Sequence, residues 1–243
     1  MGDVRMRLLL RTAIAVGVTM CALGAWSMDG GRFSNTAFAD DVEKIKPPKE
    51  KNRLSISYRP EAAYNQPKYN VTLGVLPMTD KRVMKFYGGS DAFFIETLPD
   101  AIGDTLYYEL KASNLFRNVR RLSVPSGDIS SPEALAKIAA DNGVDLLMTA
   151  DLVHFNLLRK KMMNDKKSPD FQLNVHFSFV GQLIEPRSGI ILWAEQIRRE
   201  HGSLNSSGEV APYEYTGNAI EALKAGFTDM KQLIMATGLE IAR

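Results

Sequence analysis

The stretch from Val144 to His201 constrains the fold of this chain more than any other part of the sequence. Between residues 171 and 179 every second residue is apolar, and the intervening residues are polar. The apolar set consists of Phe171, Leu173, Val175, Phe177 and Phe179. Successive side chains of a strand point to opposite faces of a sheet, so this alternation predicts a strand with one buried and one solvated face.

Two further segments complete an antiparallel meander around this strand. An apolar run at 144–158 precedes it, and a segment at 190–201 containing Trp193 follows it. A lysine-rich tip at 159–170 and a turn at 185–189 that contains proline and glycine provide the two connections. The sequence therefore predicts three long neighbouring strands.

The remaining periodic segments predict three helices and two short strands. Apolar residues recur every three or four positions at 98–110 and at 220–234, which indicates amphipathic helices. A third helix is predicted to begin at Ser131-Pro132 and to end at Asn142-Gly143. Short strands are expected at 71–76 and 119–124. We predict an α+β fold, with a mixed sheet that contains the meander and with helices packed on one face.

The amino terminus has the features of a Sec-type secretory signal. Three arginines, Arg5, Arg7 and Arg11, precede an apolar run at 12–26. Ala37 and Ala39 then form the small-x-small pattern that signal peptidase requires, which makes Asp40 the predicted first mature residue. We therefore expect a periplasmic protein, and its association with the membrane stays open.

Two other fates of this segment stay open. The apolar run is shorter than the roughly 20 residues that span a bilayer comfortably, but an uncleaved anchor is one alternative. Lipidation at Cys21 is the other, although Met20 occupies a position where a lipobox has a small residue. Cys21 is the only cysteine, so a chain cleaved after Ala39 has no thiol for a disulfide, a thiolate metal site or a nucleophile.

Charge and composition characterise the chain that follows the predicted signal. The full chain carries a formal net charge of +2, and the predicted signal contains four arginines and two aspartates, so the mature chain is close to neutral. Near-neutrality and export together argue against nucleic-acid binding. Residues 40–68 are rich in proline and charge and are expected to be an extended linker. We expect 69–243 to form a single domain after the signal (1–39) and this linker.

Three segments resemble a group of bacterial envelope proteins with a fold like the amino-terminal domain of TolB. They are Leu76–Arg82, which resembles the exit of the first strand, Asn142–Ala150, which opens the meander, and Ile184–Trp193, which resembles the meander turn. The group includes peptidoglycan-synthase activator lipoproteins, the curli secretion channel subunit and YajG-like lipoproteins. The chain departs from this group in its poor lipobox and in Glu185-Pro186, which stands where the turn has Asp.

The sequence contains none of the catalytic motifs that we sought. There is no G-x-S-x-G elbow, H-E-x-x-H pair or Walker loop, so we expect no enzyme and no cofactor. The predicted hairpins would place His154 close to His176, and His201 near Asn174, on the solvated face of the sheet. Three imidazoles gathered there could bind zinc or copper, although solvated surface histidines are the more ordinary interpretation, and no metal ligand is assigned.

Charged residues supply the candidate contact sites. Asp80 and Arg82 follow the first strand, where they either contact a partner or simply solvate the strand exit. The meander tip gathers five basic residues that either form an ordinary solvated loop or touch a membrane surface or an acidic partner. They are Arg159, Lys160, Lys161, Lys166 and Lys167.

These observations favour a noncatalytic periplasmic accessory or scaffold protein that docks on a partner in a cell-envelope assembly or transport machine. The alternative is a periplasmic protein that binds a metal or a small ligand through the histidine-bearing face. The sequence names neither the envelope partner nor the oligomeric state.

Overall fold

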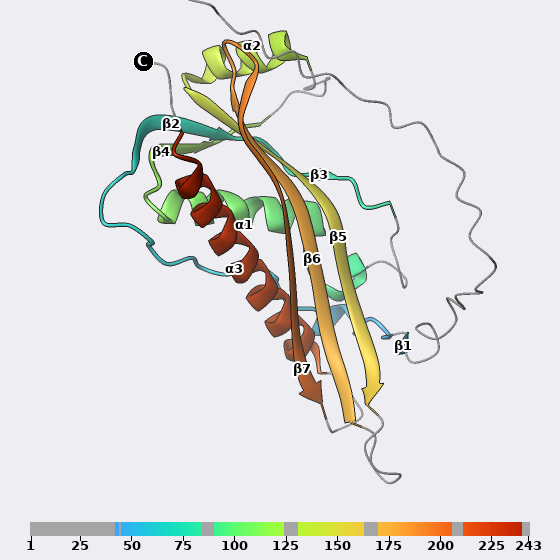
Figure 1. Ribbon diagram of the computed structural model, residues 1–243. Coiled ribbons are helices and arrows are strands. Elements are labelled where there is room, and N and C mark those ends of the chain that lie inside the picture. Colours follow the sequence, from blue (N-terminus) through green and yellow to red (C-terminus); the bar gives the residue numbers. More distant parts are fainter. Residues whose placement is uncertain are drawn as a thin grey trace, which may run out of the picture. The chain divides into compact units, whose positions relative to one another are not determined.

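The computed structural model describes residues 42–43, 45–83, 90–123, 131–162, 170–205 and 211–239, all within one unit that spans Phe38–Arg243. Within these ranges, three α-helices lie against a mixed sheet (Figure 1). The elements in chain order are β1 (Val42–Glu43), η2 (Glu50–Asn52), β2 (Tyr69–Val75), β3 (Thr79–Asp80), η3 (Ser90–Phe93), α1 (Leu98–Ala112), β4 (Phe116–Arg121), α2 (Pro132–Asn142), β5 (Leu146–Met162), β6 (Asp170–Glu185), β7 (Ile190–Asn205) and α3 (Pro212–Thr237). None of the helices in these ranges combines the length and the apolar character needed to cross a membrane.

The sheet has the strand order β4-β2-β5-β6-β7. β2 is parallel to both β4 and β5, whereas β5, β6 and β7 form the predicted antiparallel meander. Two short strands pair with β5 as well: β3 in parallel and β1 in antiparallel orientation. The predicted α+β class with a mixed sheet and a three-stranded meander is confirmed.

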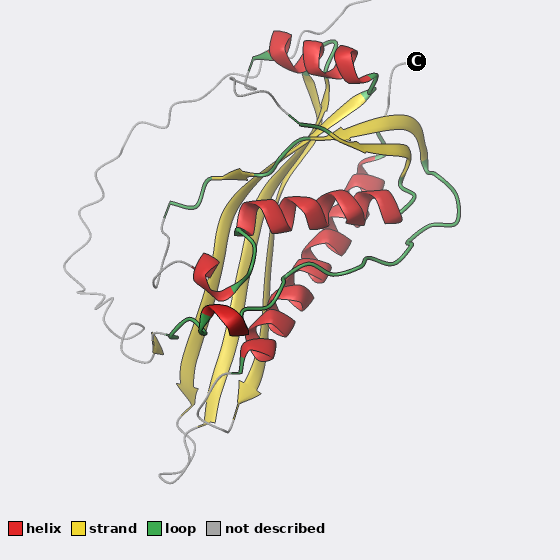
Figure 2. Ribbon diagram, turned by 180° about the vertical axis from the view of Figure 1, so that it is seen from behind, coloured by secondary structure: helices red, strands yellow, loops and turns green. Residues whose placement is uncertain are grey.

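The helices occupy both faces of the sheet rather than one. Leu146 and Met148 of β5 join the main core with α1 and α3, which lie in front of the strands in Figure 2. Leu147 points the other way, into a smaller cluster with Leu135 of α2. The chain passes through α1 from β2 to β4, and then through α2 back past β2 to β5. Right-handed crossovers in opposite directions place their helices on opposite faces, so the expectation of a single covered face was wrong for α2.

Local signals set both ends of α2 and the end of α1 where the sequence placed them, whereas α3 begins at Pro212, before the predicted 220. The Ser131 side chain accepts a hydrogen bond from the backbone N–H of Ala134 at the start of α2. Gly143 ends α2 with φ 58°, a left-handed conformation that glycine adopts without steric cost. Asn114, the predicted stop of the first helix, likewise has φ 53° just after α1.

The segment predicted as a linker lies against the domain. Ile56 has no exposed surface and belongs to the main core, and the Tyr58 hydroxyl donates a hydrogen bond to Glu109 on α1. Leu54, Ile56 and Tyr58 alternate with polar residues, so an extended chain presents all three to the same side. The backbone of 53–68 is largely without regular structure, but the folded unit begins well before Tyr69.

Close packing between β6 and its two neighbouring strands depends on Gly181 in β6. A Cβ atom at this position would lie 2.9 Å from Cζ3 of Trp193 and 3.0 Å from Cε of Met148, both of which are buried. Gly217 in α3 is the opposite case, because an added Cβ would meet nothing within 4 Å.

We predict that Gly181→Ala lowers the free energy of unfolding by about 1–3 kcal/mol, because the tryptophan ring must shift in a packed core. Gly217→Ala is the matched control and should be neutral or stabilising by up to about 1 kcal/mol, since alanine favours a helix interior. Urea unfolding monitored by circular dichroism measures both. Equal effects from the two variants would contradict the close packing at Gly181.

Candidate functional site

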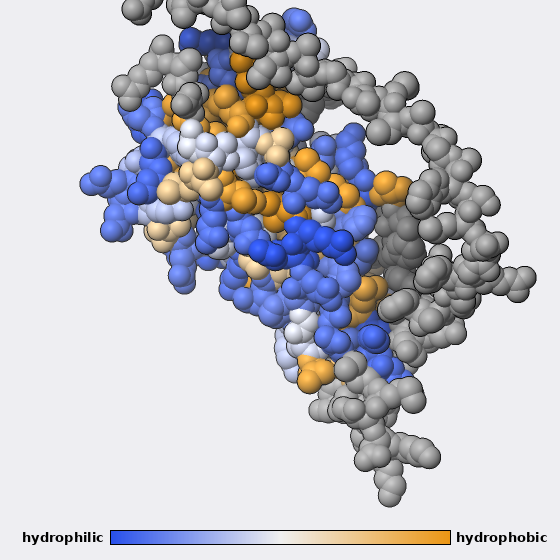
Figure 3. All heavy atoms as spheres, in the orientation of Figure 1, coloured by the Kyte–Doolittle hydropathy of each residue, from blue (hydrophilic) through white to orange (hydrophobic). Residues whose placement is uncertain are grey.

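The side of the meander turned away from α1 and α3 is called the outer face here. It consists of alternate residues of β6 together with their cross-strand neighbours in β5 and β7. One row joins Asn156, His176 and Glu200, and the next joins His154, Ser178 and Arg198. α2 covers one end of this face through Leu147 and Ile184. Figure 3 shows that the surface is mixed near α2 and mostly hydrophilic toward the other end.

The histidines do not gather as predicted. His154 and His176 share the outer face, but His201 lies opposite Val175, so it belongs to the face that α3 covers. The predicted pairing of His201 with Asn174 differs from the observed one by a single residue, and a one-residue change of register moves a side chain to the other face. His176 instead contacts Glu200, with 3.0 Å between Nε2 and Oε1.

This arrangement overturns the predicted cluster of three imidazoles. Among the described residues, no group of three or more His, Cys, Asp or Glu side chains is placed to hold a metal ion. The Nδ1 atom of His154 lies 2.6 Å from the backbone oxygen of Val153, its own neighbour in the chain.

Arg82 has an internal role rather than an exposed one. Its guanidinium makes a two-pronged contact with Asp80, with Nε–Oδ1 and Nη2–Oδ2 distances of 2.7 Å, and it also reaches Asp91. The Arg82 side chain is only 3% exposed. Hydrogen bonding to Asp80 is the main cause that raises the pKa of Arg82 above its ordinary value. This network ties the exit of β3 to η3, and the predicted partner contact at Asp80 and Arg82 stays a prediction.

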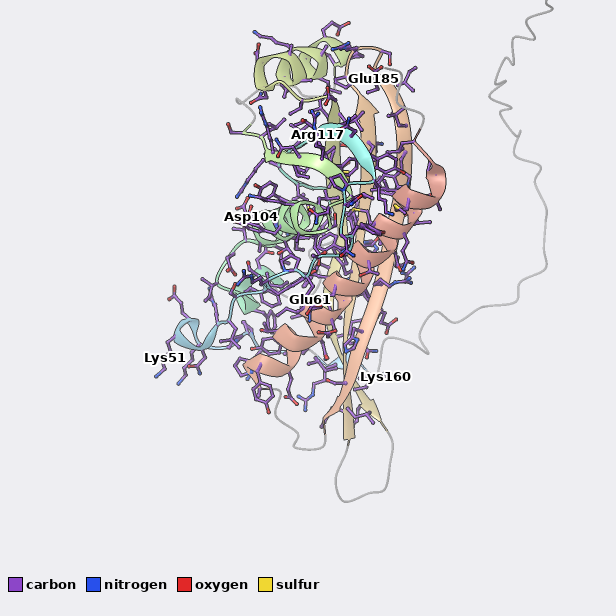
Figure 4. All side chains as sticks on the ribbon, turned by 90° about the vertical axis from the view of Figure 1, so that its left-hand side faces the viewer. Lys51, Glu61, Asp104, Arg117, Lys160 and Glu185 are labelled. Atoms are coloured by element: carbon purple, nitrogen blue, oxygen red, sulfur yellow. The ribbon has the colours of Figure 1, made fainter. Side chains whose placement is uncertain are left out.

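The basic end of the meander comprises the predicted tip residues, of which the structure describes Arg159, Lys160 and Lys161. Arg159 lies over the ring of Phe171, with its guanidinium carbon 3.6 Å from the ring centroid, whereas Lys160 and Lys161 are exposed. Lys160 stands near one end of the meander in Figure 4, and Glu185 of β6 stands near the other. The predicted tip residues Lys166 and Lys167 lie outside the described residues, as do the predicted signal residues Ala37, Ala39 and Asp40.

A buried polar triad was missed by the sequence analysis. Nζ of Lys231 on α3 lies 2.6 Å from Oε2 of Glu109 on α1, and the hydroxyl of Tyr58 donates to Oε1 of the same carboxylate at 2.6 Å. The side chains of Lys231 and Glu109 are 10% and 6% exposed. Burial, followed by the hydrogen bond to Glu109, raises the pKa of Tyr58 well above its ordinary value, so the phenol stays protonated as a donor.

All three residues of this triad line a pocket of about 450 Å³ between α1, α3 and the segment 58–64. The sequence did contain a signal for it. Glu109 follows Leu106 by three positions, and Lys231 follows Phe227 by four, so both charges fall on the apolar stripes of their helices. Charged residues at buried helical positions must pair, because an unpaired buried charge is very costly.

We predict that Glu109→Gln lowers the free energy of unfolding by about 3–5 kcal/mol, because Lys231 is left buried without its counter-charge. Adding Lys231→Met to Glu109→Gln should recover most of that loss. Arg121→Gln is the control, since its pair with Asp104 is exposed and should contribute less than about 1 kcal/mol. Chemical denaturation measures all three, and a double variant no more stable than Glu109→Gln alone would contradict the pairing.

Comparisons with known proteins give structural neighbours only. No protein-family model matches the chain, and no match to a curated protein was found. A DUF330-family protein from Xanthomonas campestris has a TM-score of 0.46 and 12% identity over 75% of this chain and 94% of its own. Lipoprotein GNA1162 from Neisseria meningitidis has a TM-score of 0.28 and 13% identity over 66% and 99%. The LpoB C-terminal domain from Salmonella enterica has a TM-score of 0.25 and 14% identity over 58% and 86%.

These neighbours include bacterial envelope proteins of the kind that the sequence resembles. Every TM-score among them is below 0.5 and every identity is below 25%, so no inference about the activity or partner of this chain follows from them.

Proposed function

We propose that this chain is an exported, noncatalytic accessory protein that docks on a protein partner in a cell-envelope assembly. The observation that carries the proposal is the outer face of the meander. β5, β6 and β7 are 17, 16 and 16 residues long, and among the described elements only α2 covers part of their outer face. A broad sheet face of polar and half-buried side chains offers many spaced hydrogen-bonding groups to another protein.

The side chains of this face favour docking of a partner over catalysis. His176 is engaged with Glu200, and Gln196 donates to Ser178, so these polar groups form neighbouring pairs rather than a convergent reaction site. Lys160, Gln172 and Leu204 form a row near the basic end. We include exposed Lys160 in the proposed contact surface, where it would favour an acidic partner.

Export is the first requirement of this function. We expect the mature protein to begin at Asp40, because Ala37 and Ala39 present small side chains to signal peptidase. Mass spectrometry of the protein recovered from the periplasm measures the mature amino terminus. A mass that retains the amino-terminal segment, or a diacylglyceryl group on Cys21, would replace cleavage after Ala39 with one of the two anchored forms.

The docking surface is testable by photo-crosslinking in cells. A photoreactive amino acid at Asn156 or Gln182, both on the outer face, should capture one envelope protein that mass spectrometry identifies. The same group at Glu221, an exposed residue of α3, is the matched control and should not capture that protein. Absence of an adduct from both outer-face positions, or the same adduct from Glu221, would reject the outer face as the docking surface.

A further inference from the structure

β7 forms one edge of the sheet, and this edge is open along the described chain. It pairs with β6 on one side, and no described strand pairs with its other side. A strand of 16 residues at an edge presents a long row of backbone N–H and C=O groups. Such rows are templates for pairing with another strand, and natural proteins either block them or use them.

A groove lies between this strand and α3. Residues 196–199 of β7 form one wall of the groove, and one side of α3 forms the other. Ile197 lies there with only 3% of its surface exposed, whereas Leu233 on α3 is 39% exposed. Strand addition to an edge beside a helix is a recurring mode of recognition, in which the backbone supplies hydrogen bonds and the groove receives alternate side chains.

The charges of β7 complement those of a second copy of the same strand. Glu195 and Arg199 lie on the same face, because their neighbours in β6 are Gly181 and Phe177. In an antiparallel pairing centred on Ile197, Glu195 of each copy lies opposite Arg199 of the other. Arg199 already contacts Asp229 on α3 but is 45% exposed, so it can accept a second carboxylate. Glu195 has no ion-pair partner within the described residues.

The two ends of β7 complement each other as well. Ile191 at the start of the strand is 52% exposed, and Leu204 near its end is 72% exposed. Their neighbours in β6 are Ile184 and Gln172, so both side chains lie on the outer face. Antiparallel pairing of a strand with its own copy brings the start of one next to the end of the other. The exposed apolar side chains of the two copies therefore lie near one another at both ends of the pairing.

We propose that two copies of this chain associate through β7, in an antiparallel two-fold pairing centred on Ile197. The pairing joins the two sheets into one, and the symmetry makes each contact occur twice. Because the two-fold axis is perpendicular to the sheet, both outer faces lie on the same side and form one wider surface. The dimer does not depend on the docking function proposed above, although it would double the surface available for docking.

Analytical ultracentrifugation of the purified exported protein tests the association, and charge reversal tests the register. The unmodified protein should dimerise in the micromolar range. Glu195→Arg should weaken the dimer about tenfold or more, because two attractive pairs become repulsive. Arg199→Glu, combined with Asp229→Asn so that the new carboxylate does not face Asp229, should weaken it similarly. Mixing the two variants should produce a heterodimer, which native mass spectrometry detects. In the heterodimer, position 195 of each copy again faces a side chain of opposite charge at position 199 of the other.

Arg198→Glu is the matched control, because Arg198 points to the outer face and lies opposite neutral Gln196 in this register. Its dimer should stay within about threefold of the unmodified protein. Far-UV circular dichroism confirms that each variant is folded. Three results would each overturn the proposal: an unmodified protein that is monomeric throughout the micromolar range, equal effects of Glu195→Arg and Arg198→Glu, or no heterodimer on mixing. Photo-crosslinking from Asn156 to an envelope protein could still succeed in any of these cases, so failure of the dimer is distinguishable from failure of the docking function.

Discussion

Burial of the inner face of β6 is the interaction on which the rest of this structure depends. The rings of Phe177 and Phe179 stack with centroids 5.4 Å apart, and Phe227 of α3 packs edge-on against Phe177 at 5.9 Å. Gly226 lets α3 approach closely, since a Cβ there would lie 3.0 Å from the Phe177 ring. This seam holds α3 on one side of the meander and leaves the polar residues of the outer face free for other contacts.

A second constraint comes from charge inside the protein. Glu109, Lys231 and Tyr58 belong to three segments that are far apart in the sequence, and one carboxylate joins them. Taking these charges out of water is costly, so the triad is tolerated because each charged group has a partner in good geometry. The same contact draws the 45–68 segment onto the domain, where alternating apolar residues contribute Ile56 to the core.

The strands and helices of this protein are largely predictable because their signals are local. The period-two pattern of β6, the caps of α2 at Ser131 and Gly143, and the left-handed Asn114 after α1 all act within a few residues of where they are read. The prediction that needed the exact register between neighbouring strands failed. A register wrong by one residue placed His201 beside Asn174 rather than Val175, and therefore on the wrong face of the sheet.

The sequence by itself determined which segments form strands and helices, because periodicity and capping depend on neighbouring residues. Only the tertiary structure decided the register of β7, the face that α2 covers and the partners of Glu109 and Arg82. These features depend on the direction of the crossovers and on contacts between segments that are far apart in the sequence. No local pattern encodes which of those segments meet. For the same reason, the outer face and the open edge of β7 became recognisable as surfaces only after the meander had its helices and its register.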